Sequence, residues 1–546
     1  MPEPKTTETE AAPAKTVTEQ LDALFAPWNR TDEPGLVVGV VKDGALIYRR
    51  GFGMASLETA VANTPKTRMR IGSTSKHFTC LLALLLAEEG KLDMDAPIQT
   101  YIPEMTGPGG DPTVRQLVQH RGGSRCYLDL AFVGQGMVVP PRGTALESLA
   151  RQSGRNFAPG AAMIYNNGGY HLVSIAIERV GGAPFEAQLK ARLFDVVGMP
   201  DTASIPSDHD ITPGIATMHA PGRNGWRRGL FPSDEVKGEG AIVSTIDDMQ
   251  RWMAHLRTRD LFGSAATWAA LTELPRYADG SLGVYALGLI VGKYRGLNIV
   301  HHSGGVMGGT CQMLTLPDDG LDVIIMANGG RDANVGRLAE QVVDIVLADQ
   351  VGPEAPKVMA EPNQALKGPW RSRESGVLYN LVEEEGQLKL AFGLGQVGLP
   401  LVPTEDGGFA APAASLSEIR LTPAAEDLDI RFGGKTARYT RAVAGEGDTD
   451  AFAAAAEGRY ACAEIGATAT IAREGEAVKL RLSDGYGKAD LGLTVLGDDL
   501  AAPTSGGILA GFGAAVELIH AEGVVTGFTI NTMRTRGLVF ERVEGR

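Results

Sequence analysis

The sequence is poor in cysteine and lacks long hydrophobic runs. Four cysteines occur among 546 residues, at positions far apart: Cys80, Cys126, Cys311 and Cys462. Because they show no paired ligand spacing, we expect buried or free thiols rather than a disulfide framework or a zinc site. The apolar run 81–87 is followed directly by Glu88-Glu89-Gly90, so it is too short to cross a membrane.

Positive charge and aromatic residues are also scarce. Lys and Arg number 51 against 65 Asp and Glu, the formal net charge is −14 at pH 7, and aromatic residues make up 6% of the chain. An acidic chain repels nucleic acid and anionic membrane surfaces, so neither is expected as a partner. Residues 1–18 begin with a polar stretch rich in Pro, Ala and Glu, without the apolar core of a signal peptide. They predict a disordered tail and a cytoplasmic protein.

A chain of 546 residues predicts two or three domains. Strand-like runs at both ends of residues 19–350 enclose helical segments, which favours an α+β domain: an antiparallel sheet flanked by helices, with a helical subdomain. The elements expected there include a hairpin over 35–50, strands over 285–291, 298–302, 311–316 and 322–326, and a helix over 335–347.

A linker containing proline follows at 351–356 and marks a domain boundary. Beyond it the chain is rich in glycine, with short alternating runs and almost no convincing helix. Two segments, 364–443 and 455–546, share turn positions and strand runs. This similarity predicts two small antiparallel β-barrels of one lipocalin-like type, joined by a stretch rich in Gly and Ala.

Ser73 and Lys76 stand at Ser-x-x-Lys spacing, where an apolar helix is expected to begin. On a helix these two side chains share a face. An amine held there is poorly solvated, which favours its neutral form and lets it act as a base for the serine hydroxyl. The alternative is a chance match, with Ser73 as a helix cap and Lys76 on a solvated face.

Two later motifs supply further polar groups. Tyr165-Asn166-Asn167 is expected in a loop, and its alternative interpretation is a turn with a buried tyrosine and a capping asparagine. His302-Ser303-Gly304 follows a predicted strand, and since side chains alternate along a strand only one of His301 and His302 can face a site. A second His-x-Gly at His120 shows how weak this element is alone.

The order of the three motifs resembles that of the serine β-lactamase and penicillin-binding-protein superfamily over roughly residues 20–350. Within it, the two predicted barrels and the stretch Ser73–Cys80 are similar to the three-domain D-aminopeptidases. The resemblance implies that Ser73 is the nucleophile and that Lys76 and Tyr165 share the base role. It also implies further roles at other positions: orientation of substrate and of Lys76 by Asn167, polarisation of Tyr165 or of the leaving group by His302, an oxyanion hole formed by the N–H groups of Ser73 and Gly305, and substrate contacts from Ser303 and Gly304. No metal or cofactor is implied.

Two departures from that family bear on the choice of substrate. In the D-aminopeptidases a loop from the last barrel reaches the cleft and supplies an Asp for the substrate's amino group, but the matching stretch 502–513 contains no acid, and only Asp498 and Asp499 lie just upstream. The third motif begins with His302 rather than Lys. A His that is mostly neutral at pH 7 weakens the demand for a substrate carboxylate.

The sequence therefore predicts a serine hydrolase that forms an acyl-enzyme with small amides or short peptides, similar to a D-aminopeptidase or a D-amino-acid amidase. The alternatives are a carboxylesterase of the same fold and a non-catalytic interaction protein that resembles a penicillin-binding protein. The expected partner is a small-molecule or short-peptide substrate, and a homodimer is left open as the assembly.

Overall fold

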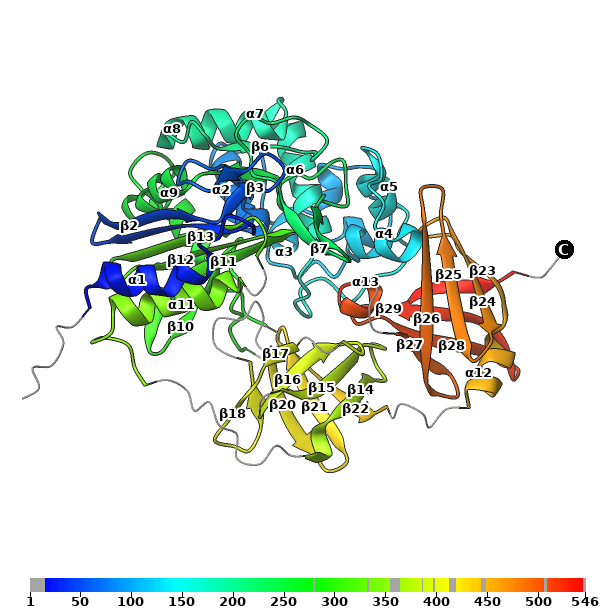
Figure 1. The fold of residues 1–546 in the computed structure, drawn as a ribbon. Coiled ribbons are helices and arrows are strands. Elements are labelled where there is room, and N and C mark those ends of the chain that lie inside the picture. Colours follow the sequence, from blue (N-terminus) through cyan, green and yellow to red (C-terminus); the bar gives the residue numbers. More distant parts are fainter. Residues whose placement is uncertain are drawn as a thin grey trace, which may run out of the picture.

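The computed structural model describes residues 15–543, apart from 278–279, 331–332, 354–363, 385, 396–397, 412–418, 443–447 and 505–507. The described chain forms three bodies: a mixed α+β domain and two β-barrels (Figure 1). The predicted fold class is confirmed.

A six-stranded antiparallel sheet in the order β10-β11-β12-β13-β1-β2 forms the centre of the first domain. Its strands are β1 (Leu36–Lys42), β2 (Ala45–Phe52), β10 (Ile290–Tyr294), β11 (Leu297–Val306), β12 (Gly309–Leu316) and β13 (Leu321–Ala327). Seven residue pairs join β1 to β13, from Leu36 opposite Ala327 to Lys42 opposite Leu321. This pairing places the start of the domain beside its end.

Helices cover both faces of this sheet (Figure 1). On one face α1 (Val17–Phe25) and α11 (Val335–Val346) pack against Leu36, Val38 and Val40 of β1. On the other face α2 (Lys76–Glu88) and α9 (Ile246–Thr258) share a core with Val37. Because side chains alternate along β1, this strand contributes to two separate hydrophobic cores, one on each face of the sheet.

The remaining elements of this domain are shorter. The helices are α3 (Val114–Val118), α4 (Tyr127–Gln135), α5 (Thr144–Ala150), α6 (Asn167–Gly181), α7 (Phe185–Leu189), α8 (Asp195–Val197) and α10 (Ala265–Thr272). The strands are β3 (Met54–Ser56), β4 (Val61–Ala62), β5 (Met69–Arg70), β6 (Ala203–Ser204), β7 (His219–Gly222), β8 (Gly225–Arg228) and β9 (Ile242–Ser244).

The first barrel is a nine-stranded sheet in the order β17-β16-β15-β14-β22-β21-β20-β19-β18, which is nearly closed. Its strands are β14 (Gly368–Ser372), β15 (Leu378–Glu384), β16 (Gln387–Phe392), β17 (Gly398–Pro400), β18 (Val402–Pro403), β19 (Phe409–Ala410), β20 (Ile419–Ala424), β21 (Asp427–Phe432) and β22 (Lys435–Arg441). It lies below the first domain in Figure 1.

The second barrel is closed, because β30 pairs back with β23. Its elements are β23 (Gly458–Cys462), β24 (Ala467–Glu474), β25 (Ala477–Ser483), β26 (Lys488–Gly497), β27 (Leu500–Pro503), α13 (Ile508–Gly511), β28 (Ala515–Ala521), β29 (Val524–Asn531) and β30 (Leu538–Arg542). It packs against α4 beside the first domain (Figure 1), and its core is continuous with that of α2 and α4.

The described structure departs from the local expectations at three places. The expected tail 1–18 lies mostly outside the described residues, but α1 already begins at Val17, with Thr16 and Glu19 forming a capping box. The expected strand 285–291 begins only at Ile290, because Gly288 turns with a φ of +74° against the start of α2. The linker between the barrels contains the helix α12 (Thr449–Ala456), whose first amides are capped by Asp448.

All four cysteines are free and buried, as their spacing predicts. Within the described residues, no helix is both long and apolar enough to span a membrane.

Candidate active site

Ser73 lies in a short 3-10 turn, η2 (Gly72–Ser75), which leads directly into α2. Gly72 has a φ of +52°, and a β-carbon there would lie 2.8 Å from the backbone nitrogen of Gly305. Glycine at this position therefore lets β11 approach the turn closely. Ser73 itself is half-buried, so its hydroxyl remains within reach of a substrate.

Lys76 is the first residue of α2 and is fully buried. Its Nζ lies 3.2 Å from Ser73 Oγ, 2.8 Å from Asn167 Oδ1 and 2.7 Å from the backbone oxygen of Glu239. Burial lowers the pKa of Lys76 to about 7, although the charge of Glu239 opposes this shift. The amine is thus partly neutral near pH 7, and it does not lie on a solvated helix face.

Tyr165 and Asn167 flank the start of α6. Asn166 caps this helix by accepting a hydrogen bond from Gly168 N–H at 2.7 Å, so Asn167 is the first helical residue rather than a loop residue as expected. The ring centroid of Tyr165 lies 4.9 Å from Lys76 Nζ, and the tyrosine hydroxyl is sealed from solvent. Burial raises the pKa of Tyr165, and the neighbouring Ser73 hydroxyl offsets part of this rise.

His302 is buried and neutral, because burial and the nearby charge of Lys76 hold its pKa well below the usual range. Its Nδ1 lies 2.5 Å from the backbone oxygen of Ser303, which can only accept, so Nδ1 carries the proton. Its Nε2 then accepts from the Tyr285 hydroxyl at 3.0 Å. His302 therefore contacts Tyr285 directly, whereas its ring centroid is 6.3 Å from that of Tyr165.

The strand β11 runs through residues 302–305 instead of ending there in a glycine turn. The Thr74 hydroxyl donates to the backbone oxygen of His302 at 3.2 Å, and a β-carbon on Gly304 would collide with the carbonyl oxygen of Ile71. On Gly305 a β-carbon would meet nothing within 4 Å, and this residue is exposed. Gly304 thus lets strand and turn pack closely, while Gly305 faces open space beside Ser73. Ser303, between them, is half-buried.

Three residues of this site were missed in the sequence analysis. His120, dismissed as part of a weak match, packs its ring 4.1 Å from that of Tyr165 and 4.5 Å from that of Tyr285, between centroids. Its Nδ1 accepts from Asn166 N–H at 3.0 Å. The second is Glu239, which stands between Gly238 and Gly240, and the third is Arg534. No local pattern marks these positions, because each reaches the site only through the tertiary fold.

The second barrel reaches the site by a different loop from the expected one. Of the stretch 502–513, residues 505–507 lie outside the described residues, and Phe512 packs against Phe132 of α4. Asp499 is exposed and pairs with His520 at 2.6 Å. The loop between β29 and β30 instead contributes Arg534.

Arg534 Nε donates to Asp129 Oδ1 of α4 at 2.8 Å, and both side chains are buried. The charge of Arg534 lowers the pKa of both Lys76 and Tyr165. The second barrel therefore adds a cation beside the site, which Asp129 neutralises.

The first barrel meets the segment before Tyr165. The hairpin between β21 and β22 presents Gly433, whose carbonyl oxygen accepts from Met163 N–H at 3.0 Å. Gly434 lies so close to Tyr277 that a β-carbon there would collide with its ring. Across the described ranges, no group of three or more His, Cys, Asp or Glu side chains is arranged to hold a metal ion.

Comparisons with known proteins confirm the resemblance predicted from the sequence. The family model described as Beta-lactamase matches residues 15–347. The chain is 27% identical over 533 residues to a D-aminopeptidase of Brucella anthropi, covering 94% of this chain and 96% of the relative.

Among solved structures, an octameric penicillin-binding protein homologue from Pyrococcus abyssi is similar with a TM-score of 0.55, at 21% identity, covering 77% of this chain and 99% of that one. A D-amino acid amidase from Ochrobactrum anthropi SV3, complexed with L-phenylalanine amide, gives a TM-score of 0.52 at 23% identity, covering 61% of this chain and 98% of that one. The family model spans more than half of the chain, and the protein therefore belongs to the beta-lactamase family.

Proposed function

We propose that Ser73 is acylated by small amides or short peptides of D-amino acids and that Lys76 is its base. The protein is a serine hydrolase of the D-aminopeptidase and amidase type. The observation that carries the assignment of residues is the placement of Lys76 Nζ between Ser73 Oγ and two carbonyl oxygens.

The two carbonyl oxygens orient the amine. Asn167 Oδ1 and the Glu239 backbone oxygen can only accept hydrogen bonds, so they engage both N–H groups of a neutral amine. The lone pair of Lys76 is then left for the Ser73 hydroxyl at 3.2 Å, which is the geometry that a general base requires. Lys76 takes the hydroxyl proton as Ser73 Oγ bonds to the substrate carbonyl carbon.

Tyr165 acts as the acid in this scheme. Since burial raises its pKa, Tyr165 is protonated at neutral pH and cannot be the resting base. Its hydroxyl neighbours Ser73, so it can pass a proton to the leaving amine or alkoxide, regaining one by way of Lys76. The backbone N–H groups of Ser73 and Gly305 form the oxyanion hole. Ser303 stays a predicted substrate contact on β11, whereas Gly304 is buried against the carbonyl oxygen of Ile71, and His302 supports the site through Tyr285.

The pair formed by Arg534 and Asp129 bears on which acyl groups the site accepts. The second barrel contributes Arg534 with its partner Asp129, and this neutral pair supplies no net negative charge for a substrate ammonium. This favours acyl groups whose amine is blocked or is recognised elsewhere. A cytoplasmic location and a homodimer stay predictions from the sequence.

Replacement of Ser73 by Ala tests the proposal. We expect hydrolysis to be abolished across a panel of D- and L-aminoacyl nitroanilides, blocked and unblocked, and short nitrophenyl esters. A fluorophosphonate probe should add its mass to the wild-type protein and not to Ser73→Ala. Ser75→Ala, in the same turn, is the matched control and should still be labelled, because the Ser75 hydroxyl only accepts from Ile242 N–H.

The panel also separates the alternatives. Rates confined to esters would favour a carboxylesterase of the same fold. Absence of both labelling and turnover in the wild-type protein would favour a non-catalytic interaction protein and refute the proposal.

A further inference from the structure

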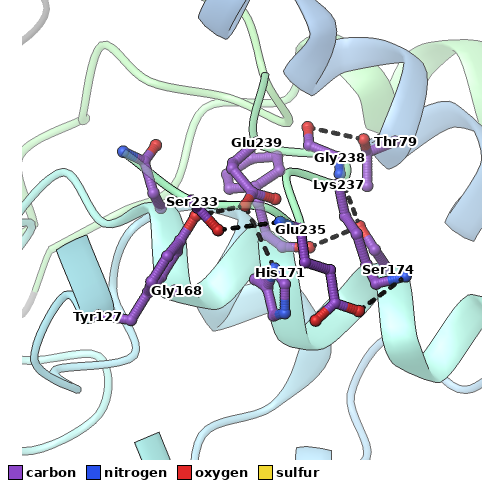
Figure 2. A network of polar contacts seen from close by, with 12 residues as sticks. Thr79, Tyr127, Gly168, His171, Ser174, Ser233, Glu235, Lys237, Gly238 and Glu239 are labelled. Carbon is purple, nitrogen blue, oxygen red and sulfur yellow. Dashed lines mark hydrogen bonds and ion pairs between the residues drawn. The ribbon is translucent and has the colours of Figure 1, made fainter. Parts of the chain in front are cut away.

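Glu239 stands in the segment between β8 and β9, and its side chain contacts one residue of α4 and one of α6 (Figure 2). Its Oε1 accepts from the Tyr127 hydroxyl at 2.7 Å and lies 3.2 Å from His171 Nδ1. Tyr127 begins α4, and His171 lies in α6. All three side chains are buried, so this is an enclosed polar cluster in the interior of the domain.

The carboxylate of Glu239 keeps its negative charge in this interior. Burial alone would raise the pKa of Glu239, but His171 and Tyr127 outweigh burial and hold the pKa below its usual value. The second oxygen, Oε2, is buried and has no hydrogen-bond partner in the described part of the chain. The cluster thus retains a charge that is costly to bury, beside the amine of Lys76.

The loop around Glu239 is fastened to the helices that carry Lys76 and Asn167. The Thr79 hydroxyl of α2 donates to the Gly238 carbonyl oxygen at 2.9 Å, and Gly238 N–H donates to Ser174 Oγ of α6 at 3.0 Å (Figure 2). A β-carbon on Gly238 would collide with both hydroxyl groups. The backbone oxygen of Glu239 is therefore held in a fixed position, 2.7 Å from Lys76 Nζ.

We propose that Glu239 is a positioning residue for Lys76: its carboxylate, anchored by Tyr127 and His171, fixes the carbonyl that orients the amine and places a negative charge beside it. The inference rests on the proposed function, in which Lys76 is the base. The backbone oxygen of Glu239 sets the direction of the lone pair on Lys76 Nζ. The carboxylate of Glu239 raises the pKa of Lys76 and so sets the pH above which the amine is neutral.

Several other groups act on Lys76 and must be considered with Glu239. Arg534 lowers the pKa of Lys76, and Cys126 and Cys80 raise it. The rings of Tyr165 and Tyr170 lie within 5.1 Å of Nζ, measured to their centroids. The neutral imidazoles of His120 and His302 complete the surroundings, since burial holds the pKa of each well below its usual range. Glu239 is the carboxylate among the groups that raise the pKa of Lys76.

The variant Glu239→Gln isolates the charge, because Gln keeps an oxygen that can accept from both Tyr127 and His171. Removal of the negative charge lowers the pKa of Lys76, so more neutral amine is present at low pH. The acid limb of kcat/KM should move down by about one unit. The ratio of kcat/KM at pH 6 to that at pH 8 should then rise about fivefold, as the neutral fraction at pH 6 grows. Glu239→Ala also breaks the cluster, and we expect a lower kcat at every pH.

Glu235→Gln is the matched control. It makes the same chemical change in the same loop, but the Glu235 carboxylate bonds to Lys237 and to Gly143 N–H instead of to the cluster. Its pH profile should coincide with that of the wild-type protein. If Glu239→Gln does not fold, Tyr127→Phe removes one anchor of the carboxylate and should lower kcat with little change in KM.

The outcomes separate this inference from the proposed function. An acid limb that stays in place in Glu239→Gln, or an unaltered kcat in Tyr127→Phe, overturns the role of Glu239 while fluorophosphonate still labels Ser73. Loss of that labelling in the wild-type protein overturns the proposed function itself. Thermal unfolding of each variant checks that it is folded under the assay conditions, so that the rates compared are those of folded proteins.

Discussion

Replacement of Asn167 by Asp places a negative charge where the wild-type protein has a neutral acceptor, 2.8 Å from Lys76 Nζ. An opposite charge at such a distance raises the pKa of an amine by about 1–3 units. Burial sets the pKa of Lys76 at about 7 in the wild-type protein. A rise of about two units lowers the neutral fraction at pH 7 from about one half to about one in a hundred, so kcat/KM at pH 7 should fall about 50-fold.

The direction of the shift in the pH profile distinguishes an added negative charge from a general disturbance of the site. The acid limb of kcat/KM should move to higher pH, and the rate of Asn167→Asp should approach its plateau again above pH 9. Asn167→Ala removes the acceptor without adding a charge, and its rate should be lower at all pH values without an upward shift of the limb. The assay is kcat/KM from pH 5.5 to 10 with an uncharged ester, accompanied by thermal unfolding. A wild-type profile that is flat between pH 6 and 8, or an acid limb that stays in place in Asn167→Asp, would refute the assignment of Lys76 as base.

Two further predictions concern the barrels. Arg534→Met leaves the Asp129 carboxylate buried without its cationic partner. This change should lower the free energy of unfolding by about 3–5 kcal/mol in denaturant titrations. Stability equal to that of the wild-type protein would contradict a buried ion pair at this interface. Gly434→Ala should destabilise the protein by about 1–3 kcal/mol more than Gly407→Ala, because both glycines have positive φ, at +81° and +80°, but only Gly434 lies against Tyr277. Equal losses in the two variants would show that backbone strain alone is responsible.

Helix geometry alone predicts the part of the site that lies within one turn, whereas Tyr165, Asn167 and His302 are predicted from the order of the motifs and the family resemblance. Ser73 and Lys76 are three residues apart, so their contact follows from helix geometry once the apolar helix is recognised. Glu239 gives no such signal, because it orients Lys76 through a backbone oxygen that any residue type has. His120 reaches Tyr165 only after α3 and α6 have packed together. Such contacts depend on packing between distant segments, which periodicity does not encode.

The fold shows the same division. The strands β11, β12 and β13 cover the segments where the sequence predicts strands, and β11 continues beyond its predicted end at His302. Residues 285–289 have the same apolar character but form no strand, because Tyr285 turns inward to donate to His302 and a β-carbon on Gly288 would collide with the backbone of His77. The predicted strand was wrong at 285–289, because these residues pack around His302 and the start of α2 instead of pairing within the sheet.

The helix α4 connects the second barrel to the surroundings of Lys76. Asp129 and Phe132 of this helix hold the barrel through Arg534 and Phe512. Tyr127, at the start of the same helix, donates to Glu239, whose backbone oxygen receives Lys76. A displacement of the barrel would therefore move the helix that anchors Glu239. For this reason the described contacts of the barrel help to hold Glu239 and Lys76 in place.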